Sequence, residues 1–454
     1  MTETKARTTD PTAATADRVI EGVRARAAGA EAEVIVRTGT EALTRFANSF
    51  IHQNVAEELA HVSLRVALDG RTAGAALDGP TTDEAIARLI DGALEAARVR
   101  PPDPDWPGLA PVAAAPGVDH WDDATAAADP AARASRVAGF VAATNGLEAA
   151  GACSTAAVTV AFANSAGQRL SGRTTVASLD GIARTPTSDG SARLTSVAID
   201  AIDGRSVGET AAQKARGAAD ASDVAPGRYE VILEPQCVAN LLQFLFVHGF
   251  NGRAVEEGRS FAKLGAAQFD RTLTIRDDAT DPATVGVAFD AEGTPKRALD
   301  VVRAGVTAGL LDTRRTAAKR GTQSTGHAVE GGDQIGALPS NVIVDPGDRA
   351  AADLVGGVER GILVTDFWYT RILDPRTQVV TGLTRNGVWL IEGGRIVRPV
   401  TNMRFTQSFL EALAPGAVKG VSAERALIRG GFDGAYLVPT LHLSSWNFTG
   451  GARG

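Results

Sequence analysis

The sequence is poor in cysteine and histidine, two residue types that commonly bind zinc in proteins. Only two cysteines, Cys153 and Cys237, occur among 454 residues, together with six histidines. Two cysteines form neither a disulfide framework nor a cysteine zinc cluster. So low a cysteine content fits a reducing compartment, and we expect a cytoplasmic protein.

Long hydrophobic runs are also missing. No stretch approaches the roughly 18 apolar residues needed to span a bilayer, and the first ten residues lack the hydrophobic segment of a signal peptide. The net charge is −7, which argues against a nucleic-acid backbone as the main partner. We therefore expect neither a membrane nor nucleic acid as a partner.

The overall composition is that of a globular protein. Hydrophobic residues make up 44% of the chain and 49 residues are glycine, which favours many turns and frequent strands. A chain of this length indicates two or three domains. The predicted organisation is a flexible tail (1–15), an N-terminal α+β unit (16–100), a Pro-rich linker (101–117), a central α/β segment (118–226) and a β-rich C-terminal domain (227–454).

Local patterns predict the elements of the N-terminal unit. Thr15 is a candidate cap for a helix with an apolar face, and residues 61–68 alternate between apolar and polar side chains before an Asp69-Gly70 turn. Residues 81–84 have the pattern of a capping box for a second helix. Together these patterns predict helices on one face of an antiparallel sheet.

The sequence lacks the common catalytic motifs. Residues 258–262 lack the second glycine of a Gly-x-Ser-x-Gly elbow, and no phosphate-binding glycine loop follows a strand. The adjacent acids Asp277 and Asp278 could form a paired-carboxylate site. We favour a solvated turn for them, because two acids after a strand more often lie there.

The histidines are scattered, and no His-Glu-x-x-His motif is present. The most apolar segment, residues 237–250, carries large apolar side chains at helical spacing and predicts a buried helix. His248 lies at the end of that helix before Gly249. From the residues alone, it is most simply a histidine near the C-terminal end of the helix dipole.

Several ordered blocks resemble the TldD/TldE (PmbA) family of metallopeptidases. The blocks are residues 258–265 (GRSFAKLG), 273–278 (LTIRDD), 289–295 (FDAEGTP), 305–311 (GVTAGLL), 324–327 (STGH) and 389–400 (WLIEGGRIVRPV). Their order and spacing match across nearly the whole C-terminal half, and the N-terminal half matches more loosely. Within these blocks, the residues expected to have structural roles are Gly258, Ser260, Gly265, Asp277, Asp278, Glu292, Gly293, Pro295 and Gly326.

The resemblance implies a position for a metal site and shows what has replaced it. The zinc-bearing subunit of the family carries His-Glu-x-x-x-His on a helix before the block at 258, and a cysteine near the C-terminus. This chain has Gln243, Phe244 and His248 at the three motif positions and no cysteine in residues 425–434. An amide is a poor zinc ligand, and a benzyl group cannot act as a general base. We therefore expect no catalytic residue and no metal in this chain.

The resemblance then implies a TldE/PmbA-type subunit, which lacks catalysis and pairs with a zinc-bearing TldD-type subunit to process unfolded peptides. It also implies an N-terminal α/β region followed by a barrel-like or sandwich-like C-terminal domain. Two alternatives stay open. One is a self-sufficient metallohydrolase with a rearranged site built from His248, Glu256 or Glu257, and His327. The other is a non-enzymatic binding or assembly protein, such as a homodimer that shields a peptide.

Overall fold

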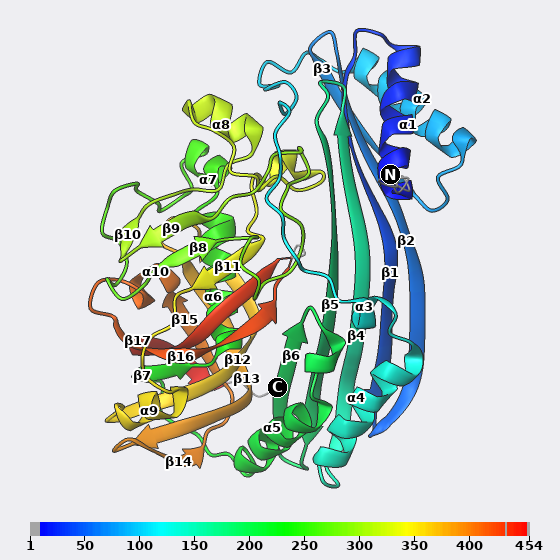
Figure 1. Cartoon of the computed structure of the whole chain (residues 1–454). Helices are drawn as coiled ribbons and strands as arrows, with labels where there is room; N and C mark the ends of the chain where they lie inside the picture. Colours follow the sequence, from blue (N-terminus) through cyan, green and yellow to red (C-terminus); the bar gives the residue numbers. More distant parts are fainter. Residues whose placement is uncertain (1–9, 432–433, 452–454) are drawn as a thin grey trace, which may run out of the picture.

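The structure, a computed structural model, describes residues 10–431 and 434–451. Within these residues the chain forms a six-stranded and an eleven-stranded β-sheet, which lie next to each other (Figure 1). Helices accompany both sheets, so the predicted α+β class, with an α/β region followed by a β-rich domain, is confirmed. Residues 1–9 of the predicted tail lie outside the described residues.

The N-terminal sheet is antiparallel throughout, in the order β3-β2-β1-β4-β5-β6. The predicted Asp69-Gly70 turn joins β2 to β3, with φ values of 50° and 71°. Because β4 pairs with β1, the segments 16–100 and 118–226 contribute to one sheet. The strands are β1 (Glu31–Ala47), β2 (Phe50–Leu68), β3 (Arg71–Asp78), β4 (Glu148–Asn164), β5 (Arg169–Arg184) and β6 (Asp189–Ser196).

Helices cover one face of this sheet, as predicted. Ala161 and Ala163 of β4 contact the helices at one end of the sheet, while Ala149 and Cys153 contact those at the other end. All four residues have odd numbers in one strand, so they lie on the same face. The helices are α1 (Pro11–Arg26) and α2 (Asp83–Val99) at one end, and α3 (Asp123–Ala126), α4 (Pro130–Ala143), the 3-10 helix η1 (Ile199–Ala201) and α5 (Gly204–Gly217) at the other.

The first helix begins earlier than the sequence suggested. α1 starts at Pro11, and the carboxylate of Asp10, not the hydroxyl of Thr15, caps it by accepting a hydrogen bond from the Thr12 N–H. Proline suits this first position because its φ is already helical and its missing N–H would have no partner there. For α2 the threonine cap is confirmed, because Thr82 accepts a hydrogen bond from the Ala85 N–H.

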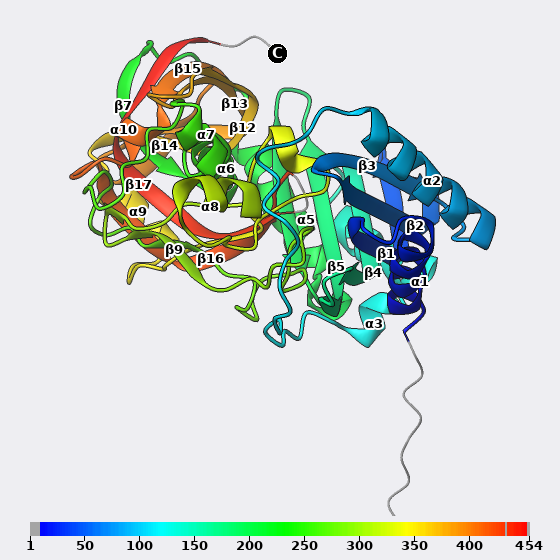
Figure 2. The same ribbon diagram turned by 90° about the horizontal axis from the view of Figure 1, so that it is seen from above.

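The opposite face of the N-terminal sheet meets the C-terminal domain. Ile35, Val160 and Phe162 project from this face and pack against Phe289 of the C-terminal domain. Viewed from above, the helices α1 and α2 and the C-terminal domain lie on opposite sides of the strands (Figure 2). The sheet is therefore the middle layer of the molecule at this end.

The Pro-rich segment between α2 and α3 fastens the two sheets together. Asp103 accepts hydrogen bonds from Thr72 of β3 and from Arg315 of the C-terminal domain. Just after this segment, the buried ring of His120 lies within hydrogen-bonding distance of the carbonyl groups of Asp281 and Gly286, at 3.1 and 2.9 Å. The segment therefore contacts both parts of the chain.

Five strands of the C-terminal sheet close into a barrel. β7 pairs with β12, and the ladder continues through β13, β15 and β17 back to β7. This ring is a barrel, one of the two forms, barrel-like or sandwich-like, that the resemblance implies. Its elements are β7 (Gly227–Leu233), α6 (Pro235–His248), β12 (Arg360–Asp374), β13 (Val379–Glu392), β15 (Met403–Ser408), α10 (Phe409–Ala412) and β17 (Ala435–Gly451).

The remaining strands extend the sheet beyond the barrel. β11 pairs with β17 and leads to β8, β9 and β10, while β14 and β16 pair with β13 and β17. These elements are α7 (Gly252–Glu256), β8 (Ile275–Asp277), β9 (Leu299–Arg303), β10 (Val306–Thr307), α8 (Arg314–Arg320), the 3-10 helix η2 (Gly332–Gln334), β11 (Asn341–Val344), α9 (Ala351–Gly356), β14 (Arg395–Pro399) and β16 (Val418–Arg429). None of the helices in the described part of the chain is long and apolar enough to cross a membrane.

Candidate functional site

Helix α6 forms where the sequence predicts it. Pro235 occupies its first turn, and the helix ends at His248 before Gly249. The apolar residues at helical spacing are buried in the core of the barrel domain and include Val238, Leu241 and Leu245. Burying such a stripe is what drives a helix of this composition to form and to pack on β12 and β17.

The three motif positions lie on the half-buried face of α6. Gln243, Phe244 and His248 are all partly exposed, unlike the buried leucines of the same helix. The ring centroid of Phe244 lies 5.9 Å from that of His248, with the planes inclined by 29°, and 5.7 Å from that of Phe409 on α10. Phe244 also packs against the barrel core. An aromatic cluster therefore occupies this face.

The stretch near the C-terminus that lacks the family's cysteine comes close to these positions. A Cβ atom built on Gly431, just after β16, would lie 3.0 Å from the amide nitrogen of Gln243. The fold thus brings Gly431, at the end of this stretch, to α6, which is where a further ligand from the tail would have to come from. The sequence supplies glycine there and no cysteine.

The residues at this place do not fit zinc. Burial, and secondarily the nearby positive charge of Arg259, lower the pKa of His248, so its imidazole is neutral near pH 7. A neutral imidazole can bind a metal, but its neighbours supply an amide and two phenyl rings. Zinc sites need three or four nitrogen, sulfur or carboxylate ligands. Across residues 10–431 and 434–451, no group of three or more His, Cys, Asp or Glu residues could hold a metal ion.

The alternative site proposed from sequence is not assembled. Glu257 binds Arg253 and Arg259, and Glu256 lies 3.7 Å from Lys319. His327 belongs to a different, buried pair with Asp277 and does not join His248 in a ligand group among the described residues. Among the described residues these side chains form no group of three or more that could hold a metal ion, so the rearranged site is not assembled in this structure.

The solvated turn expected for Asp277 and Asp278 is wrong for the first residue. Asp277 is 1% exposed and accepts hydrogen bonds from the N–H and hydroxyl of Ser340 and from the N–H of Asn341. Nε2 of His327 lies 3.1 Å from its Oδ1. Asp278, by contrast, caps a turn by accepting hydrogen bonds from the N–H and hydroxyl of Thr280.

These partners set the ionisation of Asp277. Burial alone would raise its pKa, but His327, Lys296 and the hydrogen bond from the Ser340 N–H, just before β11, outweigh it and hold the pKa at about 2. A carboxylate that stays ionised in the core and binds two backbone N–H groups fastens β8 to the segment before β11. Its role is structural.

The glycines and the serine of the family blocks shape turns around this core. Gly258, Gly265, Gly293 and Gly326 all have φ values between 64° and 78°, which glycine adopts without strain. The hydroxyl of Ser260 donates a hydrogen bond to the carbonyl of Gly249 over 2.6 Å. Ser260 thereby ties the loop after α7 to the end of α6 and fixes where that helix stops.

A second group of block residues joins the two sheets. Pro295 pairs with Phe289 in an isolated bridge that closes a tight turn. At its tip, Glu292 accepts hydrogen bonds from Arg65 of β2 and from the N–H of Arg314. Arg65 also donates to Glu33 of β1 over 2.6 Å. A network of buried charges therefore lies at the contact between sheet and barrel domain.

Burial makes two acids of this network hard to ionise. It raises the pKa of Glu33 to about 8 against the opposing attraction of Arg65. Burial and the nearby negative charge of Glu292 raise the pKa of Asp290 to about 6. Sequence reasoning missed this network, because Glu33 and Arg65 lie more than 200 residues before their partners and no local pattern connects them.

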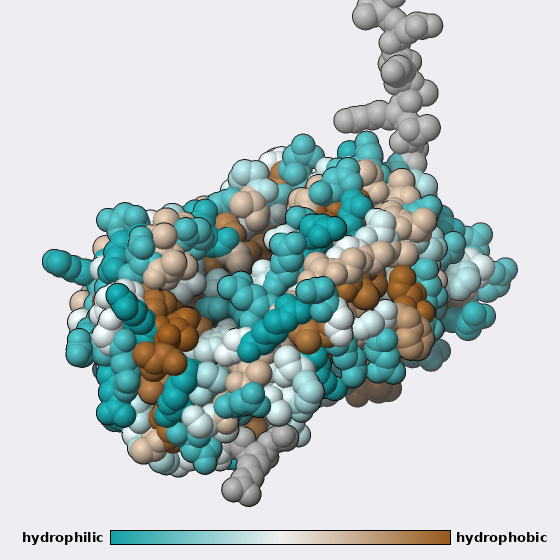
Figure 3. All heavy atoms as spheres, turned by 90° about the horizontal axis from the view of Figure 1, so that it is seen from below, coloured by the Kyte–Doolittle hydropathy of each residue, from teal (hydrophilic) through white to brown (hydrophobic). Residues whose placement is uncertain are grey.

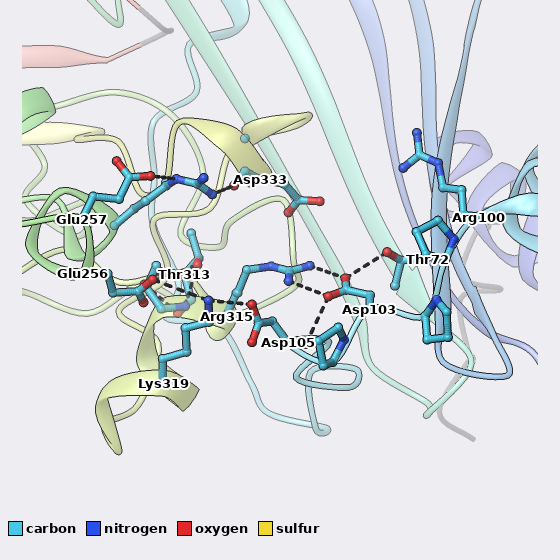
Figure 4. A pocket seen from close by; sticks show the side chains of 17 residues that line it. Thr72, Arg100, Asp103, Asp105, Glu256, Glu257, Thr313, Arg315, Lys319 and Asp333 are labelled. Carbon is cyan, nitrogen blue, oxygen red and sulfur yellow. Dashed lines mark hydrogen bonds and ion pairs between the residues drawn. The ribbon is translucent and has the colours of Figure 1, made fainter.

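A cleft of about 740 Å³ opens between the Pro-rich segment and the helices α7 and α8 (Figure 4). Arg315 binds both carboxylate oxygens of Asp103, at 2.9 and 2.6 Å, and Lys319 lies 2.6 Å from Asp105. These pairs cross the cleft and hold the segment against α8. The charged groups they use are therefore not free to bind a ligand.

Comparison with known families gives two matches. Residues 226–450 match the PmbA/TldA metallopeptidase C-terminal domain, and residues 32–97 match the PmbA/TldA metallopeptidase domain 1. The first of these regions contains α6, the barrel and all the blocks described above. The second covers β2, β3 and nearly all of β1 and α2.

Individual relatives agree with this assignment. A metalloprotease of Methanothermobacter thermautotrophicus is 29% identical over 223 residues, 46% of each chain, and the metalloprotease slr0863 of Synechocystis is 27% identical over 215 residues, 45% of this chain and 44% of the relative. The matched region thus spans about half the length of these relatives. The crystal structure of TldE from Thermococcus kodakarensis shares the fold, with a TM-score of 0.86 and 19% identity over 96% of this chain and 100% of the other. The chain belongs to the PmbA/TldD family of metallopeptidases.

Proposed function

We propose that this chain is a non-catalytic, TldE/PmbA-like subunit of a heteromeric peptidase. In this proposal it pairs in the cytoplasm with a TldD-type subunit that carries the zinc ion, and the complex processes or degrades unfolded peptides. This chain would contribute binding surface and enclosure, while bond cleavage would take place on its partner.

The observation that carries the proposal is the aromatic contact at the motif positions. Where the resemblance places a glutamate base, Phe244 stacks on His248 and contacts Phe409. A benzyl group cannot accept the proton of an attacking water, and here its ring packs against the core. The stability of the domain gains from this packing, which a water-filled metal site would forfeit.

The experiment compares the lone chain with a mixture of the chain and the TldD-type subunit of the same organism. Both samples are assayed for cleavage of an unstructured peptide and for bound zinc. We expect the lone chain to hold no stoichiometric zinc and to cleave nothing, and the mixture to form a complex that cleaves. Peptide turnover by the lone chain, with zinc bound, would overturn the proposal.

A variant of this chain makes the test specific to the site. His248→Ala removes the one residue at the motif positions that could bind a metal. We expect the complex that contains this variant to keep its zinc content and to cleave within about twofold of the wild-type rate, a difference of less than about 0.5 kcal/mol. A loss of zinc or of most activity would show that His248 takes part in the chemistry.

A further inference from the structure

A loop of the C-terminal domain, residues 328–336, reaches the N-terminal sheet and contains the 3-10 helix η2. We call this loop the strap. Gly332, Asp333 and Gly336 of the strap line the cleft between the Pro-rich segment and the helices α7 and α8, where Asp333 is labelled in Figure 4. The strap therefore forms part of the wall of that cleft, and a movement of the strap would change how far the cleft is closed.

Two acidic side chains hold the strap on the N-terminal sheet. Oε1 of Glu330 lies 2.8 Å from Nε of Arg37 on β1, and its Oε2 lies 2.8 Å from Nε2 of His61 on β2. Asp333 lies 3.1 Å from a guanidinium nitrogen of Arg65, also on β2. Arginine keeps its charge throughout the pH range in which proteins stay folded. Of these three basic partners, only His61 can therefore lose its charge near neutral pH.

The ring of His61 lies between two carboxylates from different parts of the chain. Its Nδ1 is 2.6 Å from Oδ1 of Asp78 on β3, and its Nε2 faces Glu330 of the strap on the other side. An ionised carboxylate can only accept a hydrogen bond, so both ring nitrogens must donate, and only the protonated imidazolium has two N–H groups. The side chain of His61 is 23% exposed, which limits how far water can replace either partner.

The charges that face His61 come from both neighbouring strands and from the strap. Asp78 and Arg37 stand directly opposite it on β3 and β1, and Arg37 also contacts Glu330. Burial alone would lower the pKa of His61, but its hydrogen bond with Asp78 and the charge of Glu330 outweigh burial and raise the pKa above the ordinary value of 6.5. His61 thus holds its proton more tightly while the strap is closed.

On its other side the strap is fastened to the C-terminal domain. The Ala328 N–H donates a hydrogen bond to Asp290, and the side chain of Asn251, at the start of α7, donates to the carbonyl of Ile335 over 2.8 Å. Ile335 is itself 44% exposed, and η2 is a single short turn. Segments with little apolar packing open at a low cost in free energy. The strap can therefore leave the sheet while its attachments to the C-terminal domain remain.

We propose that His61 is a proton-operated latch that holds the strap on the N-terminal sheet. With a proton on both ring nitrogens, His61 donates to Asp78 and Glu330 together. The neutral ring has one N–H and can donate to only one of the two carboxylates, so the strap opens more often and the wall of the cleft moves with it. The inference does not rest on the proposed function, because it concerns movement within this chain.

The direction of the pH effect follows from proton linkage. Opening takes Glu330 away from His61, so the ring binds its proton more tightly in the closed state than in the open state. Protonation therefore favours the closed strap, and opening becomes more frequent as the pH rises above 6.5 through the higher pKa of the closed state. Arg37 keeps its contact with Glu330 at high pH, so we expect a several-fold change and not complete release.

Hydrogen exchange of the strap's own amides tests the latch. The N–H of Gly332 donates to the carbonyl of Val329, and the N–H groups of Ile335 and Gly336 donate to the carbonyl of Gly332. Two of these reporters, Gly332 and Gly336, line the cleft. Protection factors, each corrected for the exchange rate of an unstructured peptide at the same pH, should fall at least about threefold in wild type between about pH 6 and 8.5.

Two substitutions of His61 separate the effect of the proton from that of the side chain. His61→Gln has no proton to lose, so its strap should be about threefold less protected than wild type already at about pH 6 and should show no further fall. His61→Lys keeps its charge to about pH 9 or above, so its strap should stay protected across the range. Circular dichroism and thermal unfolding check that both variants are folded.

His52→Gln is the matched control. His52 is exposed and lies on the same strand as His61, at a separation of about 30 Å along it. It follows the turn between β1 and β2 at the lower end of the molecule in Figure 1, which faces the reader in Figure 3 with separate apolar patches among hydrophilic side chains. This variant should show the pH dependence of wild type.

The latch is excluded if the protection factors of the wild-type strap do not change with pH, if those of His61→Gln fall as in wild type, or if those of His61→Lys do so. A strap that does not respond to pH, in a chain that still forms an active complex with a TldD-type subunit, would exclude the latch and leave the proposed function standing. A strap that responds as expected, in a chain that cleaves peptides alone, would do the reverse.

Discussion

The ring of Phe244 lies against the imidazole of His248, one helical turn further along α6, with the planes inclined by 29°. At this spacing the two side chains project from the same face of the helix. Where the family motif has a glutamate and a histidine, this chain has an aromatic contact, extended by Phe409 from α10. The end of α6 and α10 are thereby joined through the three aromatic rings.

Phe244→Ala is expected to destabilise the protein by about 2 kcal/mol. The substitution removes the stacking on His248 and the contact with Phe409, and the cost is below that of a fully buried phenylalanine because this ring is only partly covered. Chemical denaturation of the variant and of wild type measures the difference. Phe50→Ala is the control, since that ring is 58% exposed and should cost below about 0.5 kcal/mol. Equal costs for both variants would contradict the packing role.

The sequence predicted helix α6 correctly but predicted the solvent exposure of Asp277 wrongly. The difference is that the helix depends on local residues, whereas the burial of Asp277 depends on distant ones. The helix follows from local spacing of large apolar residues, which needs no knowledge of distant segments. Whether Asp277 meets water depends on Ser340 and Asn341, which lie more than 60 residues later. Two adjacent acids look the same in sequence whether a strand covers them or not.

The difference between local and long-range contacts also explains why the hairpin turn at Asp69-Gly70 was predictable and the closure of the barrel was not. The Asp69-Gly70 turn was predictable because its two residues favour the positive φ values it needs. Closure of the barrel depends on pairing β7 with β17, two strands separated by some 200 residues. Strand-rich sequence with glycine turns predicted a β-rich domain, and the resemblance added a barrel or sandwich, but neither could give the strand order.

Asp277→Asn should reduce the loss of folding stability between pH 4 and pH 2. The pKa of Asp277 is held at about 2, below the ordinary value of 3.8, so its ionised form stabilises the fold above about pH 4 and this contribution is lost as the pH falls towards 2. The variant lacks this contribution and should be less stable at pH 7 by roughly 2 kcal/mol. Urea unfolding at several pH values tests this. A variant that loses as much stability as wild type between pH 4 and 2 would contradict it.

Glu33→Gln should reduce the loss of folding stability that wild type shows as the pH rises towards 8. Burial raises the pKa of Glu33 to about 8, so the folded state holds its proton more tightly than the unfolded state, and stability is lost as the pH rises from about 4.5 towards 8. A glutamine cannot ionise and escapes this loss. The variant should therefore lose at least about 1 kcal/mol less than wild type between pH 5 and 8. If the two curves were parallel, the attraction of Arg65 would have cancelled the effect of burial.

Gly293→Ala is expected to weaken the contact between the N-terminal sheet and the barrel domain. Gly293 has a φ of 73°, and a Cβ atom built on it would lie 2.1 Å from the ring of Phe162 on β4. Because Phe162 is itself buried, the ring has little room to move, and the substitution should cost about 3 kcal/mol or more from overlap and backbone strain together. Thermal unfolding gives the cost.

Gly265→Ala separates these two contributions. Its φ is 78°, nearly the same, but a Cβ atom there would meet nothing within 4 Å. It should therefore show the backbone cost alone, about 1 kcal/mol. If both variants lost the same stability, a shift of the turn would have relieved the overlap with Phe162. The close approach of the turn to β4 would then not be the reason that position 293 requires glycine.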